Sequence, residues 1–447
     1  MGAGAFIEPL VVVSLLFGGT WLNRNPDYRL FASSRPHRRS KHVRSGSPDS
    51  IESGFESPTD ADGLLSPRAS SPSLLSADKQ PKRRQRELRL LGFRTTVTSP
   101  NTRVFQDRFL SRLLQKFPFL VEAWYWALIY WVYQLGRAFT ALTLVEDTVN
   151  VARKHALQLI HIEQKLHIFW ELPVQHFFLQ YPTLMTWINR IYSFIHIPGT
   201  ILFLVWLYYF TTTRNRLNER QLGKPAGSIE GSPAGPALYE ARRRTMAVCN
   251  LIAFIVFTLW PCMPPRLLSD KNVKGPVGDE ARKFGFVDTV HGEGGESSVW
   301  TQNKFCNQYA AMPSLHFGYS LLIGLTILTI PLPPHQRRGL SIRLTNSLSL
   351  RLPSLRRTLS IVVGVAYPLT ILVAIVATAN HFILDAVAGA IVCGLAWTGN
   401  GVLLNLMPLE DWFLWCVRIH KPESKTVKWM EGGEDDEEWV VGKGVLP

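Results

Sequence analysis

The chain has 447 residues and a formal net charge of +14, yet charged residues make up only 18% of it, against about 25% in a typical globular protein. Its apolar residues are gathered into long runs, and residues 358–379 contain no charged side chain. About 20 consecutive apolar residues cross the ~30 Å hydrocarbon core of a bilayer. This pattern excludes a wholly soluble enzyme and a disordered scaffold.

The excess of basic residues does not indicate a nucleic-acid partner. Lysine and arginine lie between the apolar runs, where they set the orientation of a membrane protein. The five cysteines include no Cys-x-x-Cys pair, so we expect neither a metal nor a redox cofactor.

The N-terminal part of the chain divides into two regions. Residues 5–22 are apolar but lack the basic start and the cleavage site of a signal peptide, so we interpret residues 1–22 as an uncleaved membrane anchor. Residues 23–116 are rich in Ser, Pro and Arg and carry Lys or Arg at 19 positions. Because such a segment is too polar to bury a core, we predict a disordered, basic, cytosolic arm.

The remaining chain predicts a membrane domain over residues 117–405 and a cytosolic tail over residues 406–447. Six apolar spans are expected in this domain, at about 117–142, 192–212, 245–263, 315–332, 358–379 and 383–405. In the segment 151–170 the apolar residues Leu159, Ile162, Leu166 and Phe169 recur at helical spacing, which predicts a helix lying on the membrane surface. The predicted fold class is therefore all-α and integral to the membrane.

The connections between spans predict the topology. Connections 213–244 and 334–357 hold seven and six basic residues against three and zero acidic ones, whereas 143–190 and 264–312 are balanced at four to four and six to six. Cytosolic connections carry the basic excess. The first pair is thus expected in the cytosol and the second pair in the lumen or outside the cell.

His381 and Asp385 stand at the predicted outer end of the last span. The spacing His-x-x-x-Asp at a helix start puts both side chains on one face. The carboxylate can then accept the proton of one ring nitrogen and leave the other as a nucleophile. The alternative is an aspartate favoured by the helix dipole next to an interfacial histidine.

Three further residues lie at the same predicted outer side. His316 begins a span, and the preceding turn offers Ser314 and backbone N–H groups that can bind an oxyanion. Arg266 follows two prolines, and its planar guanidinium suits a phosphate group. The alternatives are a structural histidine near the interface and an arginine that reaches lipid phosphates.

Together these residue types indicate phosphoryl transfer through a phosphohistidine. They supply a nucleophile, its orienting carboxylate, a second histidine for general acid catalysis and a cation for phosphate. The sequence contains no glycine-rich Walker loop, no carboxylate pairs for two metals and no Gly-x-Ser-x-Gly elbow, so ATPase, two-metal phosphatase and serine hydrolase activities lack support.

The motifs AAMPSLHFG and ATANHFILDAVAG resemble the second and third signatures of the phosphatidic acid phosphatase type 2 superfamily. The resemblance is closest to its inositol phosphorylceramide synthase-like (inositolphosphotransferase) branch and covers about 117–405. It implies a six-helix membrane core without a cofactor. It also implies that His381 is the nucleophile, Asp385 its partner, His316 the acid that protonates the leaving group and Arg266 a phosphate ligand.

The chain departs from the phosphatase pattern in ways that favour a diester substrate. Ala374 and Ile375 stand where that pattern has Ser-Arg, Pro-Ser-Leu-His replaces Pro-Ser-Gly-His, and the lysine-containing first signature is reduced to Pro-Pro-Arg. We therefore expect an enzyme that moves a phosphorylated head group, such as inositol phosphate, from a phospholipid to a lipid hydroxyl such as ceramide. The compartment expected is the Golgi or the endoplasmic reticulum, with a lumenal active site.

Two other functions stay open at this point. A lipid phosphate phosphatase would use the same residues with water as the acceptor. A transporter or a non-catalytic scaffold would use the histidines for gating or packing, but transporters usually contain internal repeats, and the sequence has no such self-similarity.

Overall fold

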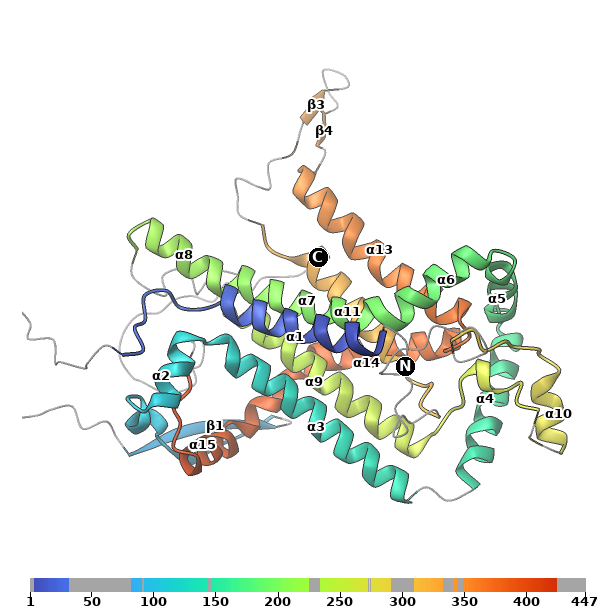
Figure 1. The fold of residues 1–447 in the computed structure, drawn as a ribbon, viewed down its shortest axis with the longest axis horizontal. Coiled ribbons are helices and arrows are strands. Elements are labelled where there is room, and N and C mark those ends of the chain that lie inside the picture. Colours follow the sequence, from blue (N-terminus) through green and yellow to red (C-terminus); the bar gives the residue numbers. More distant parts are fainter. Residues whose placement is uncertain are drawn as a thin grey trace, which may run out of the picture.

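The structure is a computed structural model, mostly helical, with two small antiparallel hairpins (Figure 1). The residues that it describes are 4–31, 82–90, 92–143, 147–224, 234–271, 273, 275–290, 309–332, 339, 341–343, 349–351 and 353–423.

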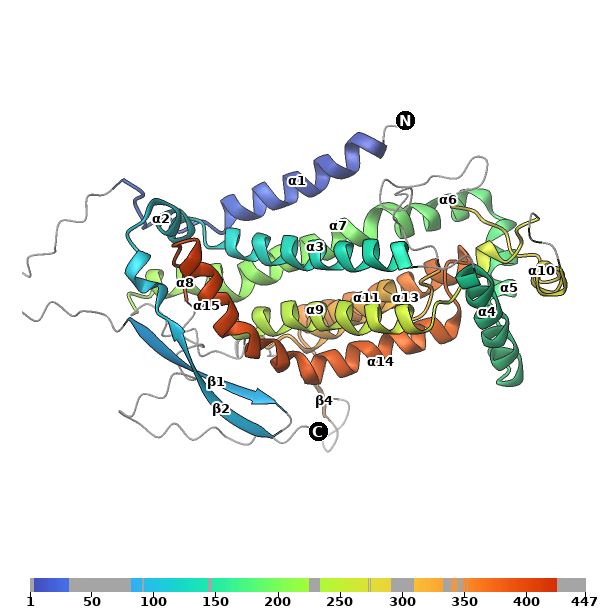
Figure 2. The same cartoon turned by 90° about the horizontal axis from the view of Figure 1, so that it is seen from below.

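A helix lies at each of the six spans predicted for the membrane domain. These helices are α3 (Phe119–Thr143), the continuous run from α6 (Pro182–Arg190) through η2 (Ile191–Ile195), α7 (His196–Tyr208) and η3 (Tyr209–Thr213) to α8 (Arg214–Gln221), α9 (Pro236–Leu259), α11 (Leu315–Thr329), α13 (Leu355–Ala377) and α14 (Ile383–Gly399). They run side by side along the molecule (Figure 2).

Three of the described helices are long and apolar enough to cross a membrane, namely Pro182–Gln221, Leu355–Ala377 and the helical run Ile383–Cys416. Shorter apolar helices lie at Pro9–Leu22 and Leu315–Thr329. Large apolar side chains on the outer faces are exposed, as at Leu359 on α13 and Ile391 on α14, which suits contact with lipid. These features are those of an integral membrane protein, and the count of six core spans stays a prediction.

The centre of the bundle is α11, which packs against α13, α14 and α9. Glycines allow the close approach: a Cβ atom at Gly324 would lie 2.3 Å from the carbonyl oxygen of Gly364 on α13. Likewise, a Cβ atom at Gly389 on α14 would lie 2.3 Å from the carbonyl oxygen of Ser314. Small residues are the usual means of bringing membrane helices together, and here they fix α14 against the start of α11.

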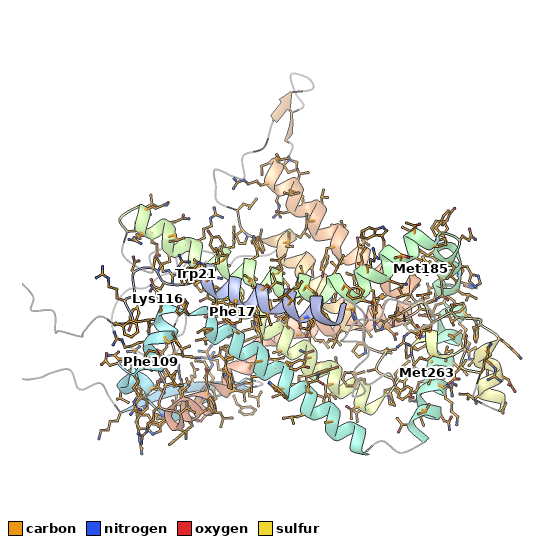
Figure 3. All side chains as sticks on the ribbon, viewed as in Figure 1. Phe17, Trp21, Phe109, Lys116, Met185 and Met263 are labelled. Carbon is orange, nitrogen blue, oxygen red and sulfur yellow. The ribbon has the colours of Figure 1, made fainter. Side chains whose placement is uncertain are left out.

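The predicted N-terminal anchor is helix α1 (Gly4–Leu22), which packs along α7. Gly19 faces Val205 and Phe119, and the Thr213 hydroxyl donates to the Asn23 side chain at 2.5 Å. Phe17 and Trp21, labelled in Figure 3, are exposed on α1. The helix thus has one face on the bundle and an apolar outer face.

The predicted disorder of residues 23–116 is wrong for their C-terminal part. Strands β1 (Arg83–Leu90) and β2 (Phe93–Pro100) form a hairpin, followed by η1 (Thr102–Phe105) and α2 (Phe109–Lys116). The hairpin packs on α15 (Met407–Cys416), which follows η5 (Asn400–Leu406). Most of the Ser/Pro-rich remainder, residues 32–81, and the acidic end of the tail, residues 424–447, lie outside the described residues.

A buried cluster of charged and polar side chains joins the folded part of the basic arm to α15. Asp411 on α15 accepts hydrogen bonds from the guanidinium groups of Arg84 and Arg86 and, at 2.7 Å, from the Ser99 hydroxyl. Asp411 and Arg86 are buried. Because the partner carboxylate lies over 300 positions away in sequence, the arm's own composition gave no sign of it.

The predicted surface helix is α4 (Asp147–Lys165), but its buried face differs from the expected stripe. Ala152, Ala156 and Leu159 are buried, whereas Ile162 and Leu166 are exposed. After α4 the chain continues into α5 (Glu171–Leu179). Helices α4, α5 and α10 (Pro276–Arg282) gather at the end of the bundle opposite the β1–β2 hairpin (Figure 2).

The connection between α11 and α13 contains the second hairpin, formed by β3 (Ser341–Arg343) and β4 (Ser349–Arg351). It lies within the basic connection 334–357.

Candidate active site

The chain turn between α13 and α14 carries His381. Helix α13 ends in a Schellman turn, in which the N–H of Asn380 donates to Ile375 at 3.0 Å and that of Ala379 to Val376 at 2.9 Å. Ala379 takes the left-handed conformation that this turn needs, with φ 51°. The turn reverses the chain and presents Asn380 and His381 at the end of the bundle.

His381 is buried and its ring has a defined orientation. Nδ1 lies 2.8 Å from the carbonyl oxygen of Ala311 and 3.5 Å from Oδ2 of Asp385. A carbonyl oxygen can only accept, so Nδ1 carries the proton and Nε2 is the unprotonated nitrogen of the neutral ring. The backbone of Ala311, which the sequence did not single out, is therefore the nearer acceptor.

Asp385 has a second function at this position. Its Oδ2 accepts the backbone N–H of Phe382 at 2.9 Å, which caps the start of α14. Asp385 is fully buried. Asp385 thus both binds the N-terminal turn of α14, a contact that the sequence did not predict, and faces the histidine ring.

His316 lies in the first turn of α11, next to His381. The two ring centroids are 5.7 Å apart. The His316 ring also stacks on Tyr192 at 4.7 Å and lies 5.1 Å from the ring of His196. His196 in turn pairs through Nδ1 with the Tyr367 hydroxyl at 3.0 Å. Neither His196 nor Tyr192 was predicted from the sequence, although a histidine inside an apolar span is a signal in itself.

Ser314 is buried and makes structural contacts. Its side chain caps α11 by accepting the N–H of Phe317 at 3.3 Å, and its own N–H donates to the backbone oxygen of Asp385 at 2.9 Å. The second bond ties the start of α11 to α14. A direct role of Ser314 in phosphate binding stays a prediction.

Arg266, in the short helix η4 (Pro265–Leu267), is held beside the His381 turn. Its backbone N–H donates to Ala379 at 2.9 Å, and its Nε donates to Oδ1 of Asn380 at 2.9 Å. Its Nη1 forms an ion pair with Asp288 at 2.9 Å. The cation is therefore held at the turn that carries His381, with part of its charge balanced by Asp288.

Ala374 and Ile375, which stand where the phosphatase pattern has Ser-Arg, supply no positively charged side chain. Ala374 and Ile375 are buried completely in the core. Among the described residues no group of three His, Cys, Asp or Glu side chains is arranged to hold a metal ion. Met263, labelled in Figure 3, marks the loop before Arg266, and its N–H donates to Ala152 of α4 at 3.1 Å.

Residues 157–220, 234–336 and 349–399 match the PAP2 superfamily, the phosphatidic acid phosphatase type 2 group. The matched ranges contain Arg266, His316, His381 and Asp385. The match supports membership of the PAP2 superfamily, and with it a lipid phosphatase or phosphotransferase type of function. No curated protein and no solved structure matches the chain. The inositol phosphorylceramide synthase-like branch stays a prediction.

Proposed function

We propose that this protein is a membrane phosphotransferase that moves a phosphorylated head group from a phospholipid to a lipid hydroxyl through a phosphohistidine on His381. One observation carries the proposal: the Nδ1 atom of His381 is held by the Ala311 carbonyl 2.8 Å away, while the His316 ring lies 5.7 Å from the His381 ring. A nucleophile and an acid are thus within reach of a single phosphoryl group.

In the first step Nε2 of His381 attacks phosphorus and the bond from phosphorus to the lipid oxygen breaks. His316 donates its proton to that departing oxygen. In the second step the acceptor hydroxyl attacks the phosphohistidine, His316 takes the hydroxyl proton, and Nε2 leaves as the neutral nitrogen. The Asp385 carboxylate stabilises the positive charge of the ring between the two steps.

The charge around Arg266 favours a phosphodiester donor such as phosphatidylinositol. A monoester carries more negative charge than a diester and needs more positive charge around it. Asp288 already balances part of the Arg266 charge, and uncharged Ala374 and Ile375 stand in the phosphatase Ser-Arg positions. These charges support our proposal of an inositolphosphotransferase with a sphingolipid such as ceramide as the acceptor.

The runner-up is a lipid phosphate phosphatase, in which water attacks the same phosphohistidine. The phosphatase would use every residue named for the transferase, so the two functions are distinguished by the products that the enzyme releases. Release of inorganic phosphate from a lipid phosphate monoester such as phosphatidic acid would favour the phosphatase.

The proposed placement is a six-helix membrane core with the active site facing the lumen of the Golgi or the endoplasmic reticulum. The site lies at the end of the bundle opposite the β1–β2 hairpin (Figure 2). The basic connections 213–244 and 334–357 and the hairpin support a cytosolic position for that other end.

The experiment is to incubate the purified protein with phosphatidylinositol labelled in its head group, with and without ceramide. We expect labelled inositol phosphorylceramide only when ceramide is present, and none from His381→Ala. Release of inositol phosphate at the same rate without ceramide would overturn the transferase assignment in favour of a hydrolase that uses water as the acceptor.

A further inference from the structure

Two glutamates from outside α14 bind the first turn of that helix. The N–H of Ile383 donates to Oε1 of Glu171 at 2.7 Å, and the N–H of Leu384 donates to Oε1 of Glu163 at 2.8 Å. Glu163 belongs to α4 and Glu171 begins α5. The N–H groups at a helix start normally lack helical partners, and here Ile383 and Leu384 lie between His381 and Asp385 in the chain.

Both glutamates are fully buried, and each has one carboxyl oxygen without a donor. Oε2 of Glu163 and Oε2 of Glu171 accept no hydrogen bond from the residues that the structure describes. The two carboxyl groups interact with each other. Two ionised carboxylates buried next to each other would greatly raise the free energy of the folded state. A single shared proton would remove one of the two charges and let one free oxygen donate a hydrogen bond to the other.

The electrostatics agree with a protonated pair. Burial, together with the charge of Glu171, raises the pKa of Glu163 to about 9, and burial also raises the pKa of Glu171. The other titratable groups that act on the pair are Asp385 from α14 and Cys262 from the loop before η4. At neutral pH Glu163 therefore holds a proton, next to Glu171 and the N-terminal turn of α14.

We propose that Glu163 and Glu171 are positioning residues of the active site, a carboxyl pair that shares one proton and fixes the first turn of α14 so that His381 and Asp385 keep their places. The proposal rests on the proposed function of His381. The proposed pair differs from a simple helix cap because its charge depends on the shared proton. Two ionised carboxylates would repel each other, and both would also repel Asp385 and an incoming phosphate.

Three variants separate the contributions. Glu163→Gln keeps an acceptor for Leu384 and a donor toward Glu171, so it imitates the protonated state. Glu163→Leu removes both the acceptor and the donor while keeping a side chain of similar size. Glu280→Gln is the matched control, because Glu280 lies at the same end of the molecule but is exposed and pairs with the exposed His161.

We expect Glu163→Gln and Glu280→Gln to keep kcat within a few-fold of the wild type at pH 7. Glu163→Leu should lower kcat by about 100-fold with little change in KM, the cost of a small displacement of catalytic groups. In the wild type kcat should fall as the pair loses its proton near pH 9, and Glu163→Gln should move or remove that alkaline limb. A folded Glu163→Gln that loses as much activity as Glu163→Leu would overturn the proposal.

A second measurement does not depend on turnover. Infrared spectra at neutral pH should contain the carbonyl stretch of a buried protonated carboxyl group, and Glu163→Gln should lack it while Glu280→Gln retains it. Absence of the band in the wild type would overturn the shared proton. If the wild type shows the band but no turnover on any lipid phosphate, the proposed function fails and the carboxyl pair stands.

Discussion

At His381 the ring proton has two acceptors of different kinds. The Ala311 carbonyl is a neutral acceptor at 2.8 Å, and the Asp385 carboxylate is a charged one at 3.5 Å. The tautomer is therefore set by a backbone group that no side-chain substitution removes. The contribution of Asp385 is mainly its charge and its cap on Phe382.

This division of tasks gives an expectation for Asp385→Asn. The amide can still cap the helix through its oxygen, and Ala311 still orients the ring, but the charge that stabilises the positively charged ring is lost. We expect kcat to fall about 10- to 100-fold, less than the ~10,000-fold loss seen when an aspartate alone sets the tautomer. Steady-state kinetics with a matched thermal melt measure this, and a loss as complete as that of His381→Ala would contradict it.

The carboxyl pair also makes stability depend on pH. In the folded protein Glu163 holds its proton up to a pKa of about 9, whereas an unperturbed glutamate has the ordinary value of 4.5. The folded state then binds more protons than the unfolded state between these values, so the free energy of unfolding falls as pH rises from about 4.5 to about 9.

Thermal melts of the detergent-purified protein between pH 5 and pH 9 test this. We expect the melting temperature of the wild type to fall toward high pH and that of Glu163→Gln to fall less. Parallel curves for the two proteins would show that Glu163 is ionised throughout.

The glycines of α14 set how closely this helix approaches the start of α11. A Cβ atom at Gly389 would lie 2.3 Å from the backbone oxygen of Ser314, which cannot move without its helix, whereas Gly394 on the same helix has nothing within 4 Å. Gly389→Ala should therefore cost about 1–3 kcal/mol of stability, as overpacking does, and displace His381 relative to His316.

Gly394→Ala is the matched control and should leave both stability and activity near the wild-type values, since alanine is the better helix former. Melting temperature and kcat are measured for both variants. Equal effects of the two substitutions would rule out the close contact at Ser314.

The positions of the helices could be predicted from the sequence more accurately than the contacts between segments far apart in the chain. Long apolar runs such as 358–379 identify α13 directly, because crossing a bilayer needs length and apolarity and little else. Residues 83–100 look like the rest of the basic arm, since what folds them is the buried Asp411 on α15. Glu163 and Glu171 likewise looked like ordinary helix charges, because their N–H donors lie over 200 positions later in the chain.

Across the whole molecule, the two ends of the bundle have different chemistry. One end carries Arg266, His316, His381 and the buried pair Glu163 and Glu171. The other carries α8, α15 and the basic β1–β2 hairpin (Figure 2). The alternation of apolar spans predicted that Arg266, His316 and His381 lie on one side, but the contacts of Arg266 with Asn380 and Asp288 depend on how the loops cross.

The topology is tested by labelling single cysteines in sealed vesicles that expose the cytosolic face. Exposed Lys224, after α8, and exposed Lys283, after α10, are changed separately to cysteine in a chain with Cys306 and the exposed Cys416 replaced by serine. We expect a membrane-impermeant reagent to label Lys224→Cys at once and Lys283→Cys only after permeabilisation. The reverse order would invert the orientation.

The central claim, a covalent intermediate on His381, is tested most directly by trapping. The protein is mixed with a phospholipid labelled at its head-group phosphate, quenched early and mapped by mass spectrometry. We expect the phosphorylated head group on His381, none in His381→Ala, and loss of the label when a lipid hydroxyl is added. A label on another residue, or the same label in His381→Ala, would contradict the account.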